Sequence, residues 1–318
     1  MINHILVPLD GSELAECVLP HIVAIAPVTH AHITLIHVLE RSANRESNAP
    51  VDPVGWHMQK QEAQSYLDRN VELLQEKDLT VDSVVLEGSP AEVIIEFARN
   101  NGVDLIALST HGRTGLSGWN VSSVVQKILL RAFKSILLVR AYGPVLTEVQ
   151  YKRLFLASDG SARAEYILPF AMSLAQFHKS DVILGTVIQR PQTLQRFPLS
   201  DEDAQLVKQL TTKNEEDAAH YLEQLVNQFS LKELPATAKI VTVDNVLSAL
   251  YDLIEETNAD LVMIAAHGHS GERRWPFGSI ASSLIAYGST PLMIMQDLSE
   301  GEVPHTHAER AIREGKGR

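Results

Sequence analysis

Two stretches of the sequence decide the fold, and they resemble each other. The first is DLIALSTHGRTGLSGWNVSSV at residues 104–124, and the second is DLVMIAAHGHSGERRWPFGSI at residues 260–280. Each begins with an apolar run, passes through His-Gly, crosses a loop and ends on small residues that open a new apolar-periodic segment. This order predicts a strand, a glycine turn, a loop and a helix N-terminus. An open α/β sheet binds its ligand beyond the carboxyl end of such a strand, and a helix N-terminus favours an anion such as a phosphate.

The rest of the chain repeats around these stretches. HILVPLDGS at residues 4–12 matches RLFLASDGS at residues 153–161. The offset between the copies is 149 at the Asp-Gly-Ser turn (159 − 10) and 156 at His-Gly (267 − 111), so the second copy contains seven extra residues (156 − 149). We place this insertion in the long helical segment predicted at residues 201–229. A tandem repeat of this length indicates two similar domains.

The predicted domains are residues 1–140 and 151–298, with a linker at 141–150 and a flexible polar tail at 299–318. Short apolar runs alternate with helical patterns in both, and the first helix is expected from residue 13 toward residue 26, ended by Pro27. The predicted strands are residues 4–9, 32–39, 81–86, 105–109 and 136–140, and then 154–157, 182–188, 238–243, 261–265 and 292–295. Alternating strands and helices require parallel strands with right-handed crossovers. The fold class is therefore α/β, with two tandem doubly wound domains, each a five-stranded parallel sheet with helices on both faces.

The composition excludes several classes of protein. The chain has 318 residues and a formal net charge of -12, which disfavours binding to nucleic acid or to an anionic membrane surface. Its apolar runs are much shorter than the ~20 residues that span a bilayer, and the N-terminus lacks the pattern of a signal peptide. Cys17 is the only cysteine, so an internal disulfide and a cysteine-rich zinc site are both excluded. These features favour a cytoplasmic protein in which Cys17 is a buried, unreactive thiol.

Asp10 and Asp159 follow the first strand of each half and allow two interpretations. Each carboxylate can face the ligand crevice, where it would accept a hydrogen bond from an adenine amine or a ribose hydroxyl, or help to hold a divalent cation beside phosphates. Each can instead form an Asx-turn, in which the side chain bonds the backbone of its own turn. The recurrence of the residue beside the second loop leaves both interpretations open.

The His-Gly loops are the stronger signal for a ligand. Gly112 and Gly268 let the backbone approach a phosphate without a Cβ in the way, and nine residues later each loop reaches a helix start with small donor groups. The alternative is a plain turn in which serine caps the next helix. His111 and His267 precede the glycines, and we interpret them as structural hydrogen-bond donors, because the sequence places neither an acid nor a nucleophile beside them.

With these motifs the sequence resembles the universal stress protein family in its tandem form, from about residue 4 to 140 and from 153 to 296. ATP-binding members of that family carry G-x2-G-x9-G-(S/T). The resemblance implies the adenine nucleotide alpha hydrolase-like fold, with ATP, with or without Mg²⁺, as the bound cofactor. It also implies a sensor or switch in stress response that acts on a protein partner, which the sequence does not identify. We do not expect the protein to be an enzyme, because the sequence places no general base and no residue set for fast hydrolysis.

The family's ligand contacts are carried over one residue at a time, because the match is partial. The loop pattern falls on Ser109, Gly112, Ser122 and Ser123 in the first half, and on Ala265, Gly268, Gly278 and Ser279 in the second. The expected contacts on the adenine side are Pro8, Asp10 and Val38 in the first half, and Ala157, Asp159 and Val187 in the second.

The positions that depart from the family pattern predict that the two halves differ in their affinity for nucleotide. If Ser122 must adopt a left-handed conformation, the cost is on the order of 1–2 kcal/mol, whereas Gly278 avoids it. We therefore expect the second half to be the better nucleotide site. Serine and alanine at the glycine positions also favour an alternative, a stress-response interaction protein that no longer binds nucleotide. Slow ATP hydrolysis is a third hypothesis, although a P-loop lysine motif is absent.

The resemblance also predicts how the halves pack. Single-domain members of the family pair as homodimers through their last strands. Here residues 136–140 and 292–295 are expected to pair within one chain as a pseudo-dimer, which removes two exposed sheet edges. Association of two whole chains into a further homodimer is also open.

Overall fold

The computed structural model describes residues 2–40, 53–113, 121–142, 146–191, 201–269 and 275–298. The tail predicted at residues 299–318 lies outside these ranges. The elements of the first half are β1 (His4–Pro8), α1 (Glu13–Glu16), α2 (Leu19–Thr29), β2 (His32–Leu39), α3 (Pro53–Gln75), β3 (Val81–Glu87), α4 (Pro90–Asn100), β4 (Leu105–Ser109), α5 (Ser123–Arg131) and β5 (Ser135–Val139). Those of the second half are β6 (Arg153–Ala157), η1 (Ala164–Ile167), α6 (Leu168–His178), β7 (Asp181–Gln189), α7 (Asp201–Ser230), β8 (Ala236–Val243), α8 (Val246–Thr257), β9 (Leu261–Ala265), α9 (Ser279–Tyr287) and β10 (Leu292–Met295).

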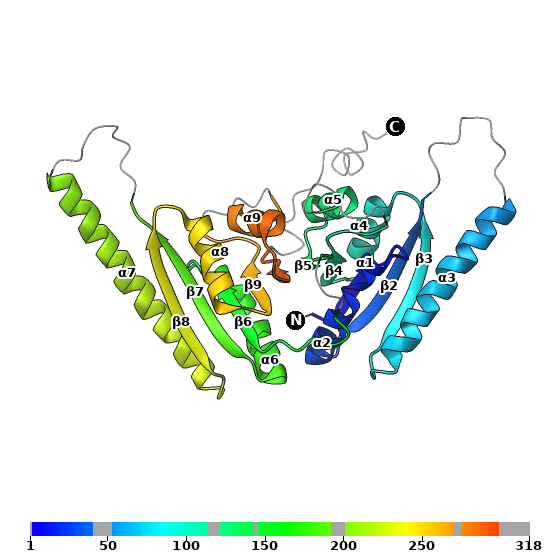
Figure 1. Cartoon of the computed structure of the whole chain (residues 1–318), viewed down its shortest axis with the longest axis horizontal. Helices are drawn as coiled ribbons and strands as arrows, with labels where there is room; N and C mark the ends of the chain where they lie inside the picture. The colour runs from blue at the N-terminus through cyan, green and yellow to red at the C-terminus, as the bar shows by residue number, and fades with distance from the viewer. Residues whose placement is uncertain are drawn as a thin grey trace.

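The strands form one continuous ten-stranded sheet in the order β3-β2-β1-β4-β5-β10-β9-β6-β7-β8. All neighbours within a half are parallel, as predicted. At the centre β5 and β10 run antiparallel, with Leu137 opposite Met293. This confirms the expected pairing of the two last strands, and it places the halves on either side of a pseudo-twofold axis (Figure 1).

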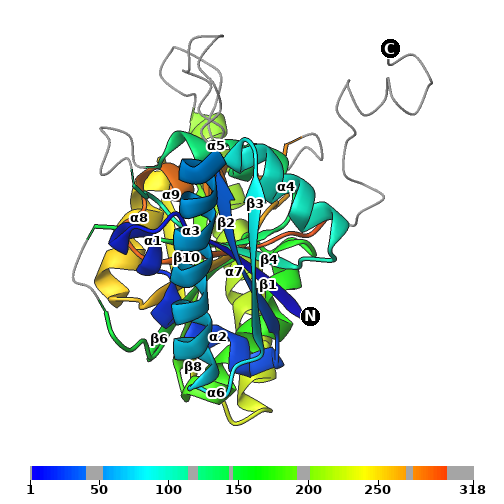
Figure 2. The ribbon, with the colours of Figure 1, turned by 90° about the vertical axis from the view of Figure 1, so that its right-hand side faces the viewer.

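The sheet carries helices on both faces, and each face has its own core. One core is built with residues of α2, α3, α6 and α7, and the other with residues of α4, α5, α8 and α9. Each core contains residues of both halves, so burial of apolar surface continues across the central strand pair. Figure 2 shows α3 lying along β2 and β3 on the outer part of the first half.

Two details of the helices test the sequence predictions. Helix α7 has 30 residues and α3 has 23, so the difference of seven confirms the predicted site of the insertion. The prediction that Pro27 ends the first helix is wrong. Pro27 lies inside α2, which ends at Thr29, where left-handed His30 donates its backbone N–H to the carbonyls of Ala26 and Pro27.

The aspartate that opens each repeated stretch ties two strands together at their starts. The Asp104 carboxylate accepts the backbone N–H groups of Asn3 and His4 at 2.7 and 3.1 Å. Asp260 accepts those of Lys152 and Arg153, both at 2.8 Å. Each pair of hydrogen bonds fixes the first strand of its half beside the strand that leads into the His-Gly turn. No helix in these described ranges is long and apolar enough to cross a membrane.

A buried arginine links the two halves beside the central strands. Arg140 follows β5 and donates from Nη1 to the Ile285 carbonyl at 2.9 Å and from Nη2 to the Leu284 carbonyl at 2.7 Å. These carbonyls lie in the last turn of α9, where the helix dipole favours a positive charge. Arg140 of the first half therefore caps a helix of the second half.

Replacing Arg140 by methionine is expected to lower the free energy of unfolding by about 2 kcal/mol. The variant loses two charged hydrogen bonds, but it also relieves the cost of burying a guanidinium whose Nε has no hydrogen-bond partner among the described residues. Urea denaturation of wild type and Arg140→Met measures the difference. Equal stability of the two proteins would show that the helix cap contributes nothing.

A second junction is formed where α2 and α6 pack together. Tyr151 is fully buried between them and shares a hydrogen bond of 2.8 Å with Nδ1 of His21. Nε2 of His178 lies 2.9 Å from the Ala24 carbonyl of the other half. Burial lowers the pKa of His21 to about 4, so this contact is made by a neutral ring.

Candidate functional site

Each half has a cavity at the carboxyl edge of its strands. The strand order reverses between β1 and β4 in the first half and between β6 and β9 in the second, which is where doubly wound sheets bind ligands. The first cavity has a volume of about 660 Å³ and the second about 440 Å³. Both are within the size range of small-molecule sites.

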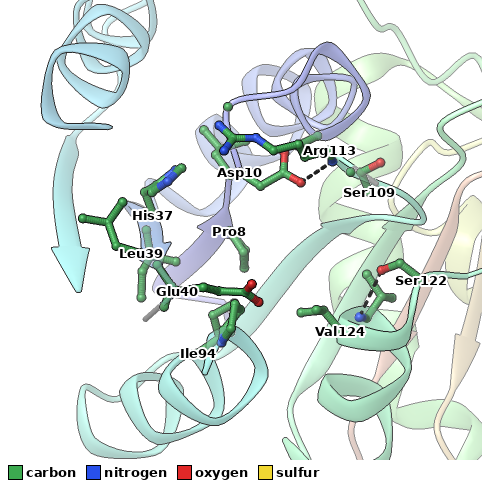
Figure 3. Close-up of a pocket in the computed structure, with 18 of the residues that line it drawn as sticks. Pro8, Asp10, His37, Leu39, Glu40, Ile94, Ser109, Arg113, Ser122 and Val124 are labelled. Atoms are coloured by element: carbon green, nitrogen blue, oxygen red, sulfur yellow. Dashed lines mark hydrogen bonds between the residues drawn. The ribbon is translucent and has the colours of Figure 1, made fainter. Parts of the chain in front are cut away.

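The structure brings together every ligand contact proposed from the sequence. In the first half these residues all line one cavity: Pro8, Asp10, Val38, Ser109, Gly112, Ser122 and Ser123. In the second half they all line the other: Ala157, Asp159, Val187, Ala265, Gly268, Gly278 and Ser279. The predicted contacts of each half come from four separate segments of the chain, and Figure 3 shows the first cavity with Asp10 and Ser122 on its wall.

The aspartates after β1 and β6 form Asx-turns. Oδ1 of Asp10 accepts the backbone N–H of Ser12 at 3.1 Å, and Oδ2 accepts the backbone N–H of Arg113 in the His-Gly loop (Figure 3). Asp159 repeats this with Ser161 at 3.0 Å and His269 at 2.7 Å. Burial alone would raise the pKa of Asp159, but the hydrogen bonds from Ser161 and His269 lower it overall. Because a carboxylate accepts about four hydrogen bonds, both interpretations of these residues are compatible with the geometry.

The glycines of the His-Gly loops have a structural role that the sequence did not suggest. A Cβ on Gly112 would lie 2.0 Å from Oδ2 of Asp10, and one on Gly268 would lie 2.1 Å from Oδ2 of Asp159. The aspartate carboxylate occupies the space that a side chain would need. The glycines therefore let the first strand's aspartate clamp the loop, and close approach to a phosphate is not required to explain them.

The expectation that Ser122 adopts a strained, left-handed conformation is wrong. Ser122 has φ -69° and ψ 160°, and Gly278 has φ -69° and ψ 174°, so both are extended and neither is left-handed. The expected strain at Ser122 is therefore absent. The difference lies in the caps, because the Ser122 hydroxyl accepts the backbone N–H of Val125 at 3.3 Å while Gly278 leaves the start of α9 without a side-chain cap.

The hydroxyl of Ser109 is used inside its own turn. It donates to the His111 carbonyl at 2.8 Å and lies 3.4 Å from Sγ of Cys17. Cys17 is partly buried and not fully buried as predicted; burial raises the pKa of its thiol, although the hydrogen bond to Ser109 opposes this, so the neutral thiol is favoured. Ser109 lines the cavity, but its hydroxyl already makes hydrogen bonds within the protein.

The second half contains an acid partner that the sequence did not reveal. Nδ1 of His267 lies 2.6 Å from Oδ1 of Asp297, and Nε2 lies 2.7 Å from the Trp275 carbonyl. Both partners only accept hydrogen bonds, so the ring must donate from both nitrogens and carry a charge. Burial lowers the pKa of His267, but the bonds to Asp297 and Trp275 raise it above the ordinary value. Arg163 also contacts Asp297, at 3.6 Å.

This ion pair fixes the second loop to the end of the sheet. Asp297 lies just after β10, in a position that carries Ala141 after β5 of the first half. The two side chains of the pair are almost completely buried. A single aspartate after the last strand was the only signal in the sequence, and nothing there indicated which residue it would meet.

Comparison with models of known protein families identifies the family to which this chain belongs. The model of the universal stress protein family matches residues 1–140 and 150–296. The chain belongs to the universal stress protein family. The match covers both halves, as expected from the tandem motifs.

Curated relatives and solved structures agree with this assignment. A universal stress protein of Methanocaldococcus jannaschii is 26% identical over 155 residues, which are 44% of this chain and 96% of the relative. Universal stress protein YxiE of Bacillus subtilis is 28% identical over 149 residues, covering 44% of this chain and all of the relative. A universal stress protein structure from Archaeoglobus fulgidus covers 94% of this chain and 100% of its own, with a TM-score of 0.65 and 16% identity. This last similarity concerns the fold alone.

Proposed function

We propose that this universal stress protein binds ATP or a related adenine nucleotide in its two cavities and acts as a cytoplasmic, non-enzymatic sensor or switch in stress response. One observation carries the proposal. Seven ligand contacts inferred from each half of the sequence line a single cavity in that half, at the point where the strand order reverses.

The helix starts supply donors for the phosphates. The first backbone N–H groups of α5 and α9 have no acceptor within their own helices. Ser123 and Ser279, the first residues of these helices, line the cavities, and a helix dipole attracts an anion to such a position. The adenine ring would lie against Val38 or Val187, which are apolar and line the opposite wall.

The second half is proposed as the tighter site for a mononucleotide. In the first half the Ser122 hydroxyl accepts the backbone N–H of Val125 and caps the helix. In the second half Gly278 has no side chain, so the equivalent N–H of Ala281 has no such cap. The second helix therefore offers one more donor to a phosphate. The extra donor, and not backbone strain at Ser122, is therefore the reason to expect that the second site binds nucleotide more tightly than the first.

Exchange of these two residues tests the ranking. Gly278→Ser is expected to weaken nucleotide binding in the second cavity about tenfold, which is the loss of one charged hydrogen bond. A Cβ at Gly278 would lie 3.5 Å from the nearest atom, so the fold accommodates it. Ser122→Gly is the matched variant and should strengthen the first cavity. Titration calorimetry with ATP measures both, and unchanged affinities would contradict the role of the caps.

The proposal as a whole is tested by the molecule that the protein retains. Mass spectrometry of the material released on denaturing freshly purified protein should detect an adenine nucleotide, and added ATP should raise the melting temperature. Absence of both effects would instead favour an interaction protein of the same fold whose cavities do not bind nucleotide. The size of Trp275 and Phe277, which line the second cavity, would then be an obstruction to the ligand.

A further inference from the structure

A third cavity lies between α8 and α9 and has no part in the candidate site. Its volume is about 270 Å³, and none of its described lining residues lines either of the two larger cavities. Val262 and Leu292, near the starts of β9 and β10, line it together with Ile254 and Leu284 of the two helices. All four side chains are buried, so the third cavity has an apolar base near the amino ends of these strands. An apolar base suits the aliphatic part of a ligand.

The rest of the lining is largely aromatic and acidic. Tyr251 and Glu255 of α8 and Tyr287 of α9 line the third cavity. Tyr287 is 72% exposed, which is a large exposure for an aromatic residue, and Glu255 is exposed as well. The hydroxyl of Tyr251 donates to the Ser283 carbonyl at 2.8 Å, and this bond links the two helices. An aromatic face attracts a cation through its quadrupole, and a carboxylate attracts one through its charge.

The ends of the two helices add to this attraction for a cation. Helix α8 ends at Thr257, shortly after Glu255, and α9 ends at Tyr287. The negative end of a helix dipole lies at the C-terminus. Arg140 caps α9 and offsets part of this effect, but it is buried and does not line the third cavity. Among the described residues that line the cavity, Glu255 is the only charged one.

The first half has a guanidinium in the corresponding position. At the offset of 156, Glu255 and Tyr287 correspond to Arg99 of α4 and Arg131 of α5. Arg99 donates from Nη2 to the Arg131 carbonyl at 2.8 Å, and Arg131 is the last residue of α5. The Arg99 side chain therefore bridges the two helices and binds the C-terminal end of α5. In the second half residue 255 is a carboxylate, so α8 cannot supply this guanidinium.

The second half differs from the first in charge and in helix packing at this position. Three cations of the first half are replaced by a carboxylate, an aromatic ring and a hydroxyl, in the pairs Arg99 and Glu255, Arg131 and Tyr287, and Lys134 and Thr290. Helices α4 and α5 pack closely, whereas α8 and α9 approach each other at few points, which leaves space for the third cavity. The second half thus has the space and the negative charge to receive a guanidinium that α8 does not provide.

We propose that the third cavity binds a guanidinium group carried on an aliphatic chain. The guanidinium forms an ion pair with Glu255 and lies against the ring of Tyr287, while the aliphatic chain contacts the apolar base. Ser289 and Thr290 also line the cavity, and their hydroxyl oxygens can accept the remaining N–H groups. Such a group occurs in free small molecules and in the arginine side chains of other proteins. The site is separate from the proposed nucleotide sites, so the inference does not depend on them.

Titration of the full chain with butylguanidinium tests the proposal, because this probe carries only the charged group and a short aliphatic chain. NMR should show saturable shifts of the backbone amide signals of Gly288 and Ser289, which line the cavity. Butylammonium should bind about threefold more weakly, because an ammonium lacks the planar fork of donors. A capped Gly-Arg-Gly peptide that binds more tightly than butylguanidinium assigns the site to an arginine of a partner protein. Equal or weaker binding of the peptide assigns it to a free small cation.

Variants in the cavity wall test the position of the site. Glu255→Gln should weaken binding of butylguanidinium about fivefold, as expected for the loss of a favourable exposed ion pair. Tyr287→Leu should weaken it about threefold, because the aromatic face is lost. Glu255→Arg introduces the residue of the first half and should abolish binding, since the new side chain can itself occupy the cavity. Asp252→Asn is the matched control, because Asp252 is an exposed acid of α8 that does not line the cavity, and it should leave the affinity unchanged.

Absence of saturable shifts in the wild-type protein would overturn the proposal. Binding that survives Glu255→Arg, or that Asp252→Asn weakens as much as Glu255→Gln does, would also overturn it, because the probe would then respond only to the overall charge of α8. Butylammonium that binds as tightly as butylguanidinium would rule out recognition of a guanidinium. Added ATP should leave the titration unchanged, so failure of this site and failure of the nucleotide sites are distinguishable.

Discussion

Asp297→Ala is expected to lower the free energy of unfolding by about 3 kcal/mol, because it leaves the buried His267 imidazolium without its carboxylate. The side chains of this pair are 0% and 4% exposed, so water cannot replace the lost partner. His267 can release its proton, which limits the cost. The neutral ring then keeps only its hydrogen bond to the Trp275 carbonyl. The link between the loop that contains Trp275 and the end of the sheet is lost.

The contribution of the His267–Asp297 pair to the free energy of unfolding depends on pH. The pKa of His267 is raised in the folded protein, so the pair contributes fully below the pKa of the unfolded chain, about 6.5. The contribution is lost as the pH rises through the folded-state pKa. Wild type should therefore exceed Asp297→Ala in stability most clearly near pH 6, and the difference should shrink in alkaline solution.

Urea denaturation at several pH values measures both effects. His269→Ala is a suitable control, because His269 lies in the same loop but is 71% exposed and makes only a 3.6 Å ion pair with Asp159. It should change stability by less than about 1 kcal/mol. A difference between wild type and Asp297→Ala that stays constant or grows with pH would contradict a charged His267.

The sequence predicted the architecture because the signals for it are local. The strand, turn and helix order is readable within each repeated stretch, and the repeat itself shows where the halves correspond. Strands that follow this order must be parallel, so their carboxyl ends meet at one edge. For that reason Asp10 and Gly112, about a hundred residues apart, could be placed in one site before the structure was known.

Contacts between side chains of distant segments were outside the reach of the same reasoning. No spacing rule relates His267 to Asp297, because their meeting depends on side-chain directions and on helix placement. Ser122 illustrates the reverse error, since a glycine position in a family pattern was taken to imply a special backbone. The structure shows an ordinary extended residue there, and the difference from Gly278 is a capping hydrogen bond.

Gly112→Ala is expected to lower the free energy of unfolding by about 3 kcal/mol. The added methyl would lie 2.0 Å from Oδ2 and 2.9 Å from Cγ of Asp10, so the carboxylate must leave its place. The carboxylate then loses its hydrogen bonds with the backbone N–H groups of Ser12 and Arg113. A hydrogen bond to a charged group contributes about 1.5–3 kcal/mol to the free energy of unfolding. If the glycine served only to admit a phosphate, the variant would fold with wild-type stability and lose binding alone.

A double-mutant cycle with Asp10→Ala separates these explanations. Once the carboxylate is gone, Gly112→Ala has nothing to collide with and should cost less than about 0.5 kcal/mol, giving a coupling energy above about 2 kcal/mol. Gly278→Ala is the matched control, because its Cβ would meet its nearest neighbour at an ordinary 3.5 Å. Gly268 and Asp159 should show the same coupling in the second half, where the corresponding distance is 2.1 Å. Additive effects in both halves would mean that the aspartate does not hold the loop, and the cavities would need another explanation for their shape.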